Sequence, residues 1–193
     1  MSIYSFPLTP LPNFVEFLNV AQANSPTEIQ NILDNWKDEW NQEAVLEGDT
    51  LSDYSLRKSV VVPLEYSDEK RWLFDRLTSI IAQANTYYHF DLNGFYEPLQ
   101  LAQYGVGDFF DWHLDFGTGD SSNRKLSMSI QLSDPDTYEG GDLEFHINNT
   151  IVKAPRTLGS AVIFPSFIRH RVSEITQGER RSIVGWVSGP PFK

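Results

Sequence analysis

Residues 126–132 read Leu-Ser-Met-Ser-Ile-Gln-Leu, an unbroken alternation of apolar and small polar side chains. Successive side chains of a β-strand point to opposite faces of its sheet, so this period of two predicts a strand with one apolar and one polar face. We expect the apolar face to lie in a core. The polar face, formed by Ser127, Ser129 and Gln131, suits the inner wall of a site.

The pattern outward from this strand is also that of short strands. Residues 161–164 are a run of four apolar side chains, and Ser182 to Trp186 reads as the last strand of the chain. Between them and the first strand, Glu139-Gly-Gly-Asp-Leu143 marks a turn or a bulge. From about Tyr87 onward the sequence therefore predicts β-structure.

The N-terminal part has the spacing of helices. Ser25-Pro-Thr-Glu28 is a capping box with proline at the first helical position, and an apolar stripe follows it to Trp36. A second helix is predicted from Ser67 to Gln83, and the polar segment 46–58 between the two helices is predicted to be a mobile loop. We expect one α+β domain over residues 1–193, with helical support and a loop region over 1–86. Residues 87–193 then form a jelly roll, with the N-terminal helices packed on its outside.

The densest group of candidate metal ligands is His113-Leu-Asp115, followed by His170. Two residues that are two apart on one strand leave the same face, and a distal histidine on a neighbouring strand completes a set of two imidazoles and one carboxylate. This set holds non-haem ferrous iron and leaves coordination positions open. The chain has no cysteine, so thiolate ligands are excluded.

Several segments around these residues carry a family resemblance. In chain order they are Tyr104-Gly-Val-Gly107, the pair His113 and Asp115, Glu139-Gly-Gly-Asp-Leu143, Phe164-Pro-Ser-Phe-Ile-Arg-His170-Arg-Val, and Gly178-Glu-Arg-Arg-Ser-Ile-Val-Gly-Trp186. Read in that order, they resemble the iron(II)- and 2-oxoglutarate-dependent oxygenases, in particular the prolyl 4-hydroxylase-like branch. The resemblance covers residues 100–186. It implies a double-stranded β-helix, which is the jelly roll predicted from the strand pattern.

The resemblance also implies roles for single residues. His113, Asp115 and His170 would bind the iron, and Arg180, ten residues after His170, would form a salt bridge with the distal carboxylate of 2-oxoglutarate. Tyr104 would place its hydroxyl on the same cosubstrate, and Ser182, on the strand face of Arg180, would add a hydrogen bond. Arg181 should point to the opposite face and lie at the surface. Collagen-type prolyl hydroxylases commonly have lysine where Arg180 stands, which weakens the expectation of a collagen-like substrate.

The activity that the resemblance implies is hydroxylation of an unactivated C–H bond, with O2 as oxidant and 2-oxoglutarate converted to succinate and carbon dioxide. The leading substrate is a prolyl residue or another amino-acid side chain of a peptide or protein. Two alternatives stay open: the same chemistry on a free amino acid, small metabolite or nucleobase, and a non-catalytic jelly-roll binding module. Arg180 argues against the module, because a structural metal site needs no carboxylate clamp. Asp115 favours hydroxylation over halogenation, since related halogenases lack a carboxylate at that position.

Composition limits the partners and the location. The formal net charge of −11 disfavours nucleic acid, because contacts with phosphate supply most of its sequence-independent affinity. The chain has no apolar run long enough to span a membrane and no signal-peptide pattern at its start, so we expect a cytoplasmic protein. The sequence does not indicate the oligomeric state, the substrate, or whether Trp186 and the segments 46–58 and 116–123 contact substrate. The remaining candidate ligands are expected to be structural or surface residues: His89, His146, Asp111, Asp120, Asp142 and Glu144.

Overall fold

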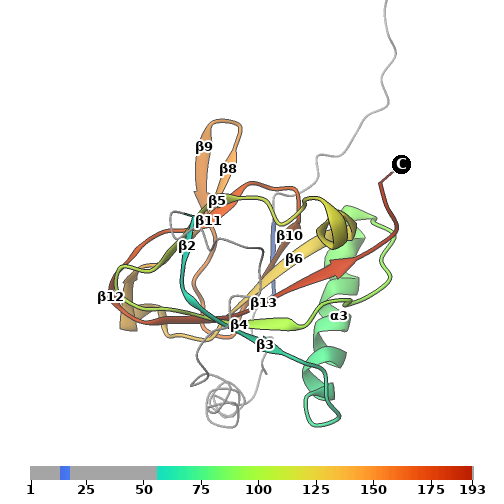
Figure 1. Cartoon of the computed structure of the whole chain (residues 1–193), viewed down its shortest axis with the longest axis horizontal. Coiled ribbons are helices and arrows are strands. Elements are labelled where there is room, and N and C mark those ends of the chain that lie inside the picture. Colours follow the sequence, from blue (N-terminus) through green and yellow to red (C-terminus); the bar gives the residue numbers. More distant parts are fainter. Residues whose placement is uncertain (1–13, 18–55, 193) are drawn as a thin grey trace, which may run out of the picture.

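The computed structural model describes residues 14–17 and 56–192. Within them, two antiparallel sheets face each other and a two-stranded sheet lies at one end (Figure 1). The larger sheet has the order β1 (Val15–Phe17), β10 (Ala161–Pro165), β6 (Arg124–Gln131), β13 (Arg180–Ser188), β4 (Leu99–Tyr104) and β3 (Val60–Leu64). The smaller sheet has the order β2 (Arg57–Lys58), β5 (Phe109–His113), β11 (His170–Val172), β8 (Leu143–Ile147) and β9 (Thr150–Lys153), and the end sheet pairs β12 (Ile175–Gly178) with β7 (Tyr138–Gly140). This arrangement confirms the predicted α+β jelly roll.

The strand predicted at residues 126–132 is β6, which lies between β10 and β13. One face of β6 is apolar and the other is polar, as the alternation predicts. The apolar side chains join the main core under the helix α3 (Arg71–Tyr88). The polar side chains Ser129 and Gln131 are also buried, and both contact Arg180 of β13. The polar face of β6 is therefore an inner wall, as expected.

Helix α3 is displaced along the chain relative to the predicted helix, Ser67 to Gln83. It begins later because residues 67–70 form a turn, and it continues to Tyr88 because Ala84 and Tyr88 extend the buried stripe. The Tyr88 hydroxyl donates a hydrogen bond to the carbonyl of Ile163 at 3.2 Å, which ties the end of the helix to β10. The helix ends at His89, which has a left-handed backbone (φ 55°). Among the described residues, no helix combines the length and the apolar character needed to cross a membrane.

The strands begin earlier than expected. β2 and β3 precede α3, in the part of the chain predicted to be loop and helical support. β3 is a β-branched run, Val60-Val-Val-Pro-Leu64, that pairs with β4 at the edge of the larger sheet, and β2 pairs with β5 in the smaller sheet. The helix predicted from Ser25 and residues 46–55 of the predicted loop lie outside the described residues. The division into regions 1–86 and 87–193 of one domain stays a prediction.

Strands β8 and β9 form a hairpin that projects from the smaller sheet (Figure 1). Its turn is Asn148-Asn149, with φ of 48° and 62°, the conformation that a two-residue hairpin turn requires and that asparagine tolerates. His146 lies on this hairpin with its ring against Trp112 at 5.7 Å, away from the space between the sheets. This position fits the structural role expected for His146.

Candidate active site

Three candidate metal ligands meet between the two sheets. His113 is the last residue of β5, His170 is the first of β11, and the antiparallel register places them opposite each other. One donor atom from each of His113, Asp115 and His170 lies within 4.8 Å of the others. Asp115 Oδ1 is 3.7 Å from His113 Nε2, and its Oδ2 is 3.4 Å from His170 Nε2. The structure therefore brings together the three residues that the sequence predicted.

The hydrogen bonds of the two histidines show which ring nitrogen is free. His113 Nδ1 lies 2.7 Å from the carbonyl of Asp111, and His170 Nδ1 lies 2.9 Å from the carbonyl of Ile168. A carbonyl oxygen only accepts, so Nδ1 carries the hydrogen in both rings and the Nε2 lone pair is left for a ligand. Both Nε2 atoms lie near Asp115, which is the arrangement that a bound cation requires.

The electrostatics of the cluster favour a cation. Burial and the nearby His170 lower the pKa of His113 to about 4, so its imidazole is neutral at neutral pH. Burial alone would raise the pKa of Asp115, but the two imidazoles, together with the nearby polar groups of Ser127 and Trp186, bring it below its ordinary value. A neutral imidazole and an ionised carboxylate are the protonation states that bind metal. Two nitrogens and one carboxylate, without thiolate, fit a ferrous ion.

Asp115 lies beyond the end of β5, so the ligand pair is not on one regular strand as expected. Other contacts hold it in place of the strand ladder. The backbone N–H groups of Asp115 and Phe116 both donate to the Ser166 carbonyl at 3.1 Å, and Arg124 Nη1 donates to the Asp115 carbonyl at 3.2 Å. Arg124 is itself held by both carboxylate oxygens of Glu97. The backbone of the ligand is thus fixed from two sides.

A buried arginine lies in the same space. Arg180 is 2% exposed, and its Nη2 donates to Gln131 Oε1 at 2.9 Å while its Nη1 lies 3.2 Å from Ser182 Oγ. Its guanidinium lies 5.6 Å from the centre of the Tyr104 ring, and the two residues are register partners on β13 and β4. No carboxylate within residues 56–192 forms an ion pair with it, although burial of an unpaired charge is costly. An anion is the partner that this group lacks.

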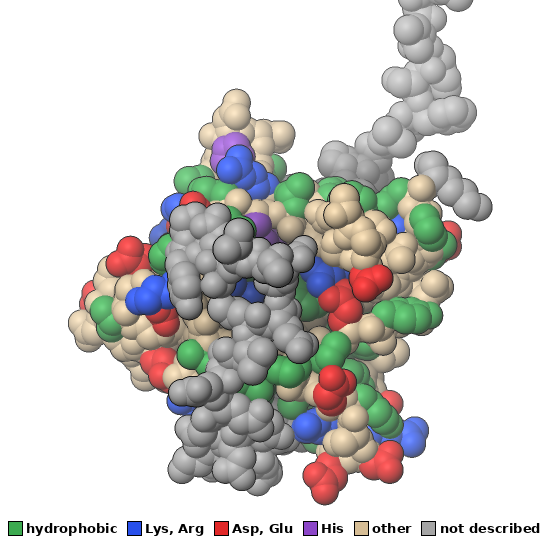
Figure 2. Space-filling view, in the orientation of Figure 1, with side chains coloured by type: hydrophobic (Ala, Val, Ile, Leu, Met, Phe, Trp, Pro, Cys, Tyr) green, Lys and Arg blue, Asp and Glu red, His purple; other side chains and the backbone are tan. Residues whose placement is uncertain are grey.

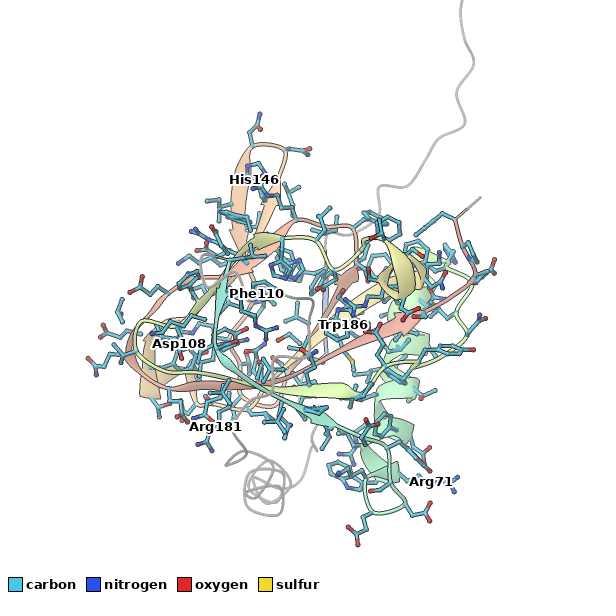
Figure 3. All side chains as sticks on the ribbon, in the orientation of Figure 1. Arg71, Asp108, Phe110, His146, Arg181 and Trp186 are labelled. Atoms are coloured by element: carbon cyan, nitrogen blue, oxygen red, sulfur yellow. The ribbon has the colours of Figure 1, made fainter. Side chains whose placement is uncertain are left out.

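One cavity contains both groups. Its lining includes the three candidate metal ligands together with Arg180, Tyr104 and Ser182. Phe110 stacks on the His113 ring at 3.5 Å, and in Figure 3 it lies across the space between the sheets from Trp186, whose ring is 3.8 Å from the Arg124 guanidinium. The cavity therefore joins a metal-binding corner to an anion-binding corner through largely apolar walls.

The structure agrees with the direction expected for Arg181 and corrects the position expected for Glu144. Arg181 lies at the edge of the molecule, where it pairs with Glu179 at 2.6 Å, so it points away from Arg180 as predicted (Figure 3). Glu144, expected at the surface, is instead 5% exposed and binds Arg171 at 2.7 Å, because β8 lies between β11 and β9 and places it beside that arginine. Arg124 and Glu97 had no sequence signal, since they stand 27 residues apart in different loops and strands.

Comparison with known proteins agrees with this geometry. The 2OG-Fe(II) oxygenase superfamily matches residues 99–188. A PKHD-type hydroxylase of Hyphomonas neptunium is 40% identical over 98 residues, which are 48% of this chain and 43% of the relative. A PKHD-type hydroxylase of Parvibaculum lavamentivorans is 39% identical over 89 residues, 45% of this chain and 40% of the relative. The matching segment thus spans less than half the length of each of these curated relatives.

Solved structures show the same fold at low sequence identity. A prolyl-4-hydroxylase of Pseudomonas putida superposes with a TM-score of 0.71 at 17% identity, covering 92% of this chain and 93% of that one. A prolyl hydroxylase of Trichoplax adhaerens, in complex with a hypoxia inducible factor peptide fragment, has a TM-score of 0.68 at 15% identity, covering 91% and 83%. The segment from residue 99 to residue 188, which holds the three candidate ligands and Arg180, is thus similar in sequence to the 2OG-Fe(II) oxygenase superfamily.

Proposed function

We propose that this chain is an Fe(II)- and 2-oxoglutarate-dependent dioxygenase that hydroxylates an unactivated C–H bond. The observation that carries the proposal is Arg180: a buried guanidinium without a carboxylate partner among the described residues, in the cavity lined by His113, Asp115 and His170. A structural metal site would have no use for an anion-binding arginine beside it. A dioxygenase needs both groups, because its cosubstrate is a dicarboxylate that must reach the metal.

Each residue has a defined part in this function. His113, Asp115 and His170 hold the metal through two Nε2 atoms and one carboxylate. Arg180 binds the distal carboxylate of 2-oxoglutarate with its planar fork, and Ser182 and Tyr104 lie beside it as hydroxyl donors. Iron and 2-oxoglutarate, when bound, would supply the oxidising chemistry, in which 2-oxoglutarate is converted to succinate and carbon dioxide while one oxygen atom of O2 enters succinate and the other enters the substrate. The stacked Phe110 and the buried Trp186 exclude water from the cavity.

The substrate that we propose is a prolyl residue or another amino-acid side chain in a peptide or protein. The curated relatives are PKHD-type hydroxylases, and two of the similar solved structures are prolyl hydroxylases, one of them with a bound peptide. Arg57 lines the cavity with its guanidinium 4.6 Å above the Phe110 ring, so it is placed to contact a polar group of the substrate. Lys58, in contrast, is paired with Asp108 at 3.1 Å.

Charge gives no support to nucleic acid as the substrate. Acidic and basic side chains are interspersed over the described part of the face shown in Figure 2, and they form no continuous basic surface there. The net charge of −11 acts in the same direction. The cytoplasmic location stays a prediction.

Turnover assays test the function directly. The protein is loaded anaerobically with Fe(II) and 2-oxoglutarate, exposed to air, and screened with proline-containing peptides, free amino acids and nucleosides. We expect succinate release matched by a mass gain of one oxygen on a peptide. His170→Ala is the control, since loss of a metal ligand should abolish both signals. Equal turnover by His170→Ala, or 2-oxoglutarate that neither binds nor reacts in the wild type, would contradict the proposal.

A further inference from the structure

Buried polar side chains on two paired strands surround the guanidinium of Arg180. Gln131 and Ser129 lie two residues apart on β6, and Ser182 lies two residues after Arg180 on β13. Ser182 and Gln131 are register partners, so these four side chains lie on one face of the larger sheet. Gln131 is 3% exposed and Ser129 is 6% exposed. The arginine is therefore held by neutral groups that are shielded from water.

Gln131 makes the shortest hydrogen bond to this guanidinium among the described side chains. Arg180 Nη2 donates to Gln131 Oε1 at 2.9 Å, compared with 3.2 Å from Nη1 to Ser182 Oγ and 3.5 Å from Nη2 to Ser129 Oγ. A guanidinium only donates, so the amide oxygen of Gln131, and not its nitrogen, must face Arg180. The amide nitrogen donates to Ser129 Oγ at 3.2 Å. The orientation of the amide is thus fixed through both of its polar atoms.

The main chain of Gln131 is held as well. Its N–H donates to the Ser160 carbonyl at 2.9 Å, and its carbonyl accepts from the Gly159 N–H at 2.8 Å. A side chain on a fixed backbone, with both polar atoms of its amide in hydrogen bonds, has little freedom to follow a moving guanidinium. Gln131 therefore determines where Arg180 Nη2 lies, and not the reverse.

The neutrality of Gln131 matters as much as its position. Within residues 56–192 no carboxylate forms an ion pair with Arg180. A carboxylate in the place of the Gln131 amide would bind the guanidinium through a charge-assisted hydrogen bond and would compete with any bound anion. An amide of the same shape accepts from the same N–H group and does not neutralise the arginine.

We propose that Gln131 is a positioning residue of the 2-oxoglutarate site: its amide oxygen orients the Arg180 guanidinium and leaves the positive charge for the distal carboxylate of the cosubstrate. This inference rests on the proposed function, and it adds that a carboxylate at position 131 removes dicarboxylate binding although Arg180 is still present. A purely structural Gln131 would affect 2-oxoglutarate only as far as its replacement changes stability. The two roles therefore separate when affinity and stability are measured on the same variants.

The experiment compares Gln131→Glu and Gln131→Met with the wild type, all loaded anaerobically with Mn(II) in place of Fe(II). Calorimetry measures the affinity for 2-oxoglutarate and for 2-oxopentanoate, which has a methyl group in place of the distal carboxylate. Gln131→Glu should bind 2-oxoglutarate about a hundredfold more weakly and 2-oxopentanoate almost unchanged, because only the first ligand needs the charge of Arg180. Gln131→Met keeps the length of the side chain without the acceptor, and should weaken 2-oxoglutarate binding about tenfold.

Two further measurements separate positioning from folding. The unfolding temperature of metal-free Gln131→Glu should not fall, because the introduced carboxylate pairs with Arg180, so affinity is lost without loss of stability. Mn(II) affinity in the absence of 2-oxoglutarate should be equal in all the proteins. Gln83→Glu makes the same exchange at an exposed position of α3 and is the matched control, which should leave both oxo-acid affinities unchanged.

The outcomes distinguish this inference from the proposed function. Wild-type affinity for 2-oxoglutarate in Gln131→Glu would overturn the inference and leave the proposed function intact. Equal losses for the two oxo acids would likewise overturn it, since they would show a general disturbance of the site. If Gln131→Glu does not fold, an unchanged 2-oxoglutarate affinity of Gln131→Met would overturn the inference by itself. Wild-type protein that does not bind 2-oxoglutarate would overturn both the inference and the proposed function.

Discussion

At the scale of single residues, the candidate site contains two buried charged side chains, Arg180 and Asp115. Removing one partner of a buried ion pair costs about 3–5 kcal/mol, because an uncompensated charge stays in a medium of low dielectric constant. Arg180 lowers that cost with amide and hydroxyl acceptors from Gln131 and Ser182. Those neutral groups leave its positive charge available to the proposed dicarboxylate cosubstrate, and the ionised Asp115 is available to the proposed metal.

The neighbours Arg180 and Arg181 provide a matched pair of substitutions. Arg180→Ala removes the proposed charge-assisted contact with 2-oxoglutarate, which at about 1.5–3 kcal/mol should raise the apparent 2-oxoglutarate requirement tenfold or more. Arg180→Lys keeps the charge without the fork, so its effect should be smaller. Arg181→Ala, at the edge of the molecule, should matter much less. The measurement is the 2-oxoglutarate dependence of succinate formation, with Fe(II) binding as the readout that should not change. Equal effects at the two positions would refute the assignment of Arg180 as the clamp.

The sequence revealed site residues when a local pattern marked them. His113, Asp115, His170 and Arg180 each stand in a segment with its own motif, and the alternation around Ser129 identified a polar inner wall. The pair Arg124 and Glu97 was not predictable, because its contact depends on how two distant parts of the chain approach each other. The same holds for the stacking of Phe110 on His113, because a register shift between β5 and β11 lies between these two residues and the sequence does not display it.

At the scale of elements, strict periodicity in the sequence predicted that a strand or helix forms. It did not predict the residues at which the element begins and ends. β6 was identified because its alternation is unbroken, whereas β2 and β3 are too short and too close to a polar segment to show a period. The helix α3 was found but misplaced by several residues at each end, since its C-terminus is fixed by a tertiary contact of Tyr88. Tertiary packing, which the sequence does not display, decides where such elements start and stop.

The turn after β7 lies beside Arg180, so a substitution in this turn tests how it supports the proposed 2-oxoglutarate site. Gly141 has φ +64°, and a Cβ there would lie 2.3 Å from Ile175 Cδ1 and 3.1 Å from Arg180 Cδ. Gly141→Ala should therefore lower stability by about 3 kcal/mol, through a strained backbone together with overpacking, and should also raise the 2-oxoglutarate requirement. Gly119→Ala is the control: φ is +62° but nothing lies within 4 Å, so only the backbone cost of about 1 kcal/mol applies. Urea unfolding of the two variants measures the difference, and equal losses of stability would show that the contacts are relieved without cost.

At the scale of the whole molecule, the two sheets supply different parts of the candidate site. The larger sheet supplies the anion clamp from β13, β6 and β4 and packs its other face on α3, while the smaller sheet supplies both histidines from β5 and β11. The cavity lies between them, so the relative placement of two rigid layers sets the distance from the clamp to the metal ligands. A site shared by two packed sheets is held more accurately than one on loops, which leaves motion to the segments that border it.

The segment 116–123 is the described part of the chain best placed to move when substrate binds. It begins directly after Asp115, and its 3-10 turn, Gly119–Asn123, contains no buried residue, so few apolar contacts hold it. An oxygenase needs its reacting cavity closed to water, and we expect this segment to gain order around substrate. Hydrogen exchange of the protein loaded with Fe(II) and 2-oxoglutarate, with and without a peptide shown to be hydroxylated, should reveal slower exchange in this segment. Amides of α3, on the far face of the larger sheet, should exchange equally in both states. Unchanged protection at 116–123 alongside confirmed turnover would exclude this segment as a lid.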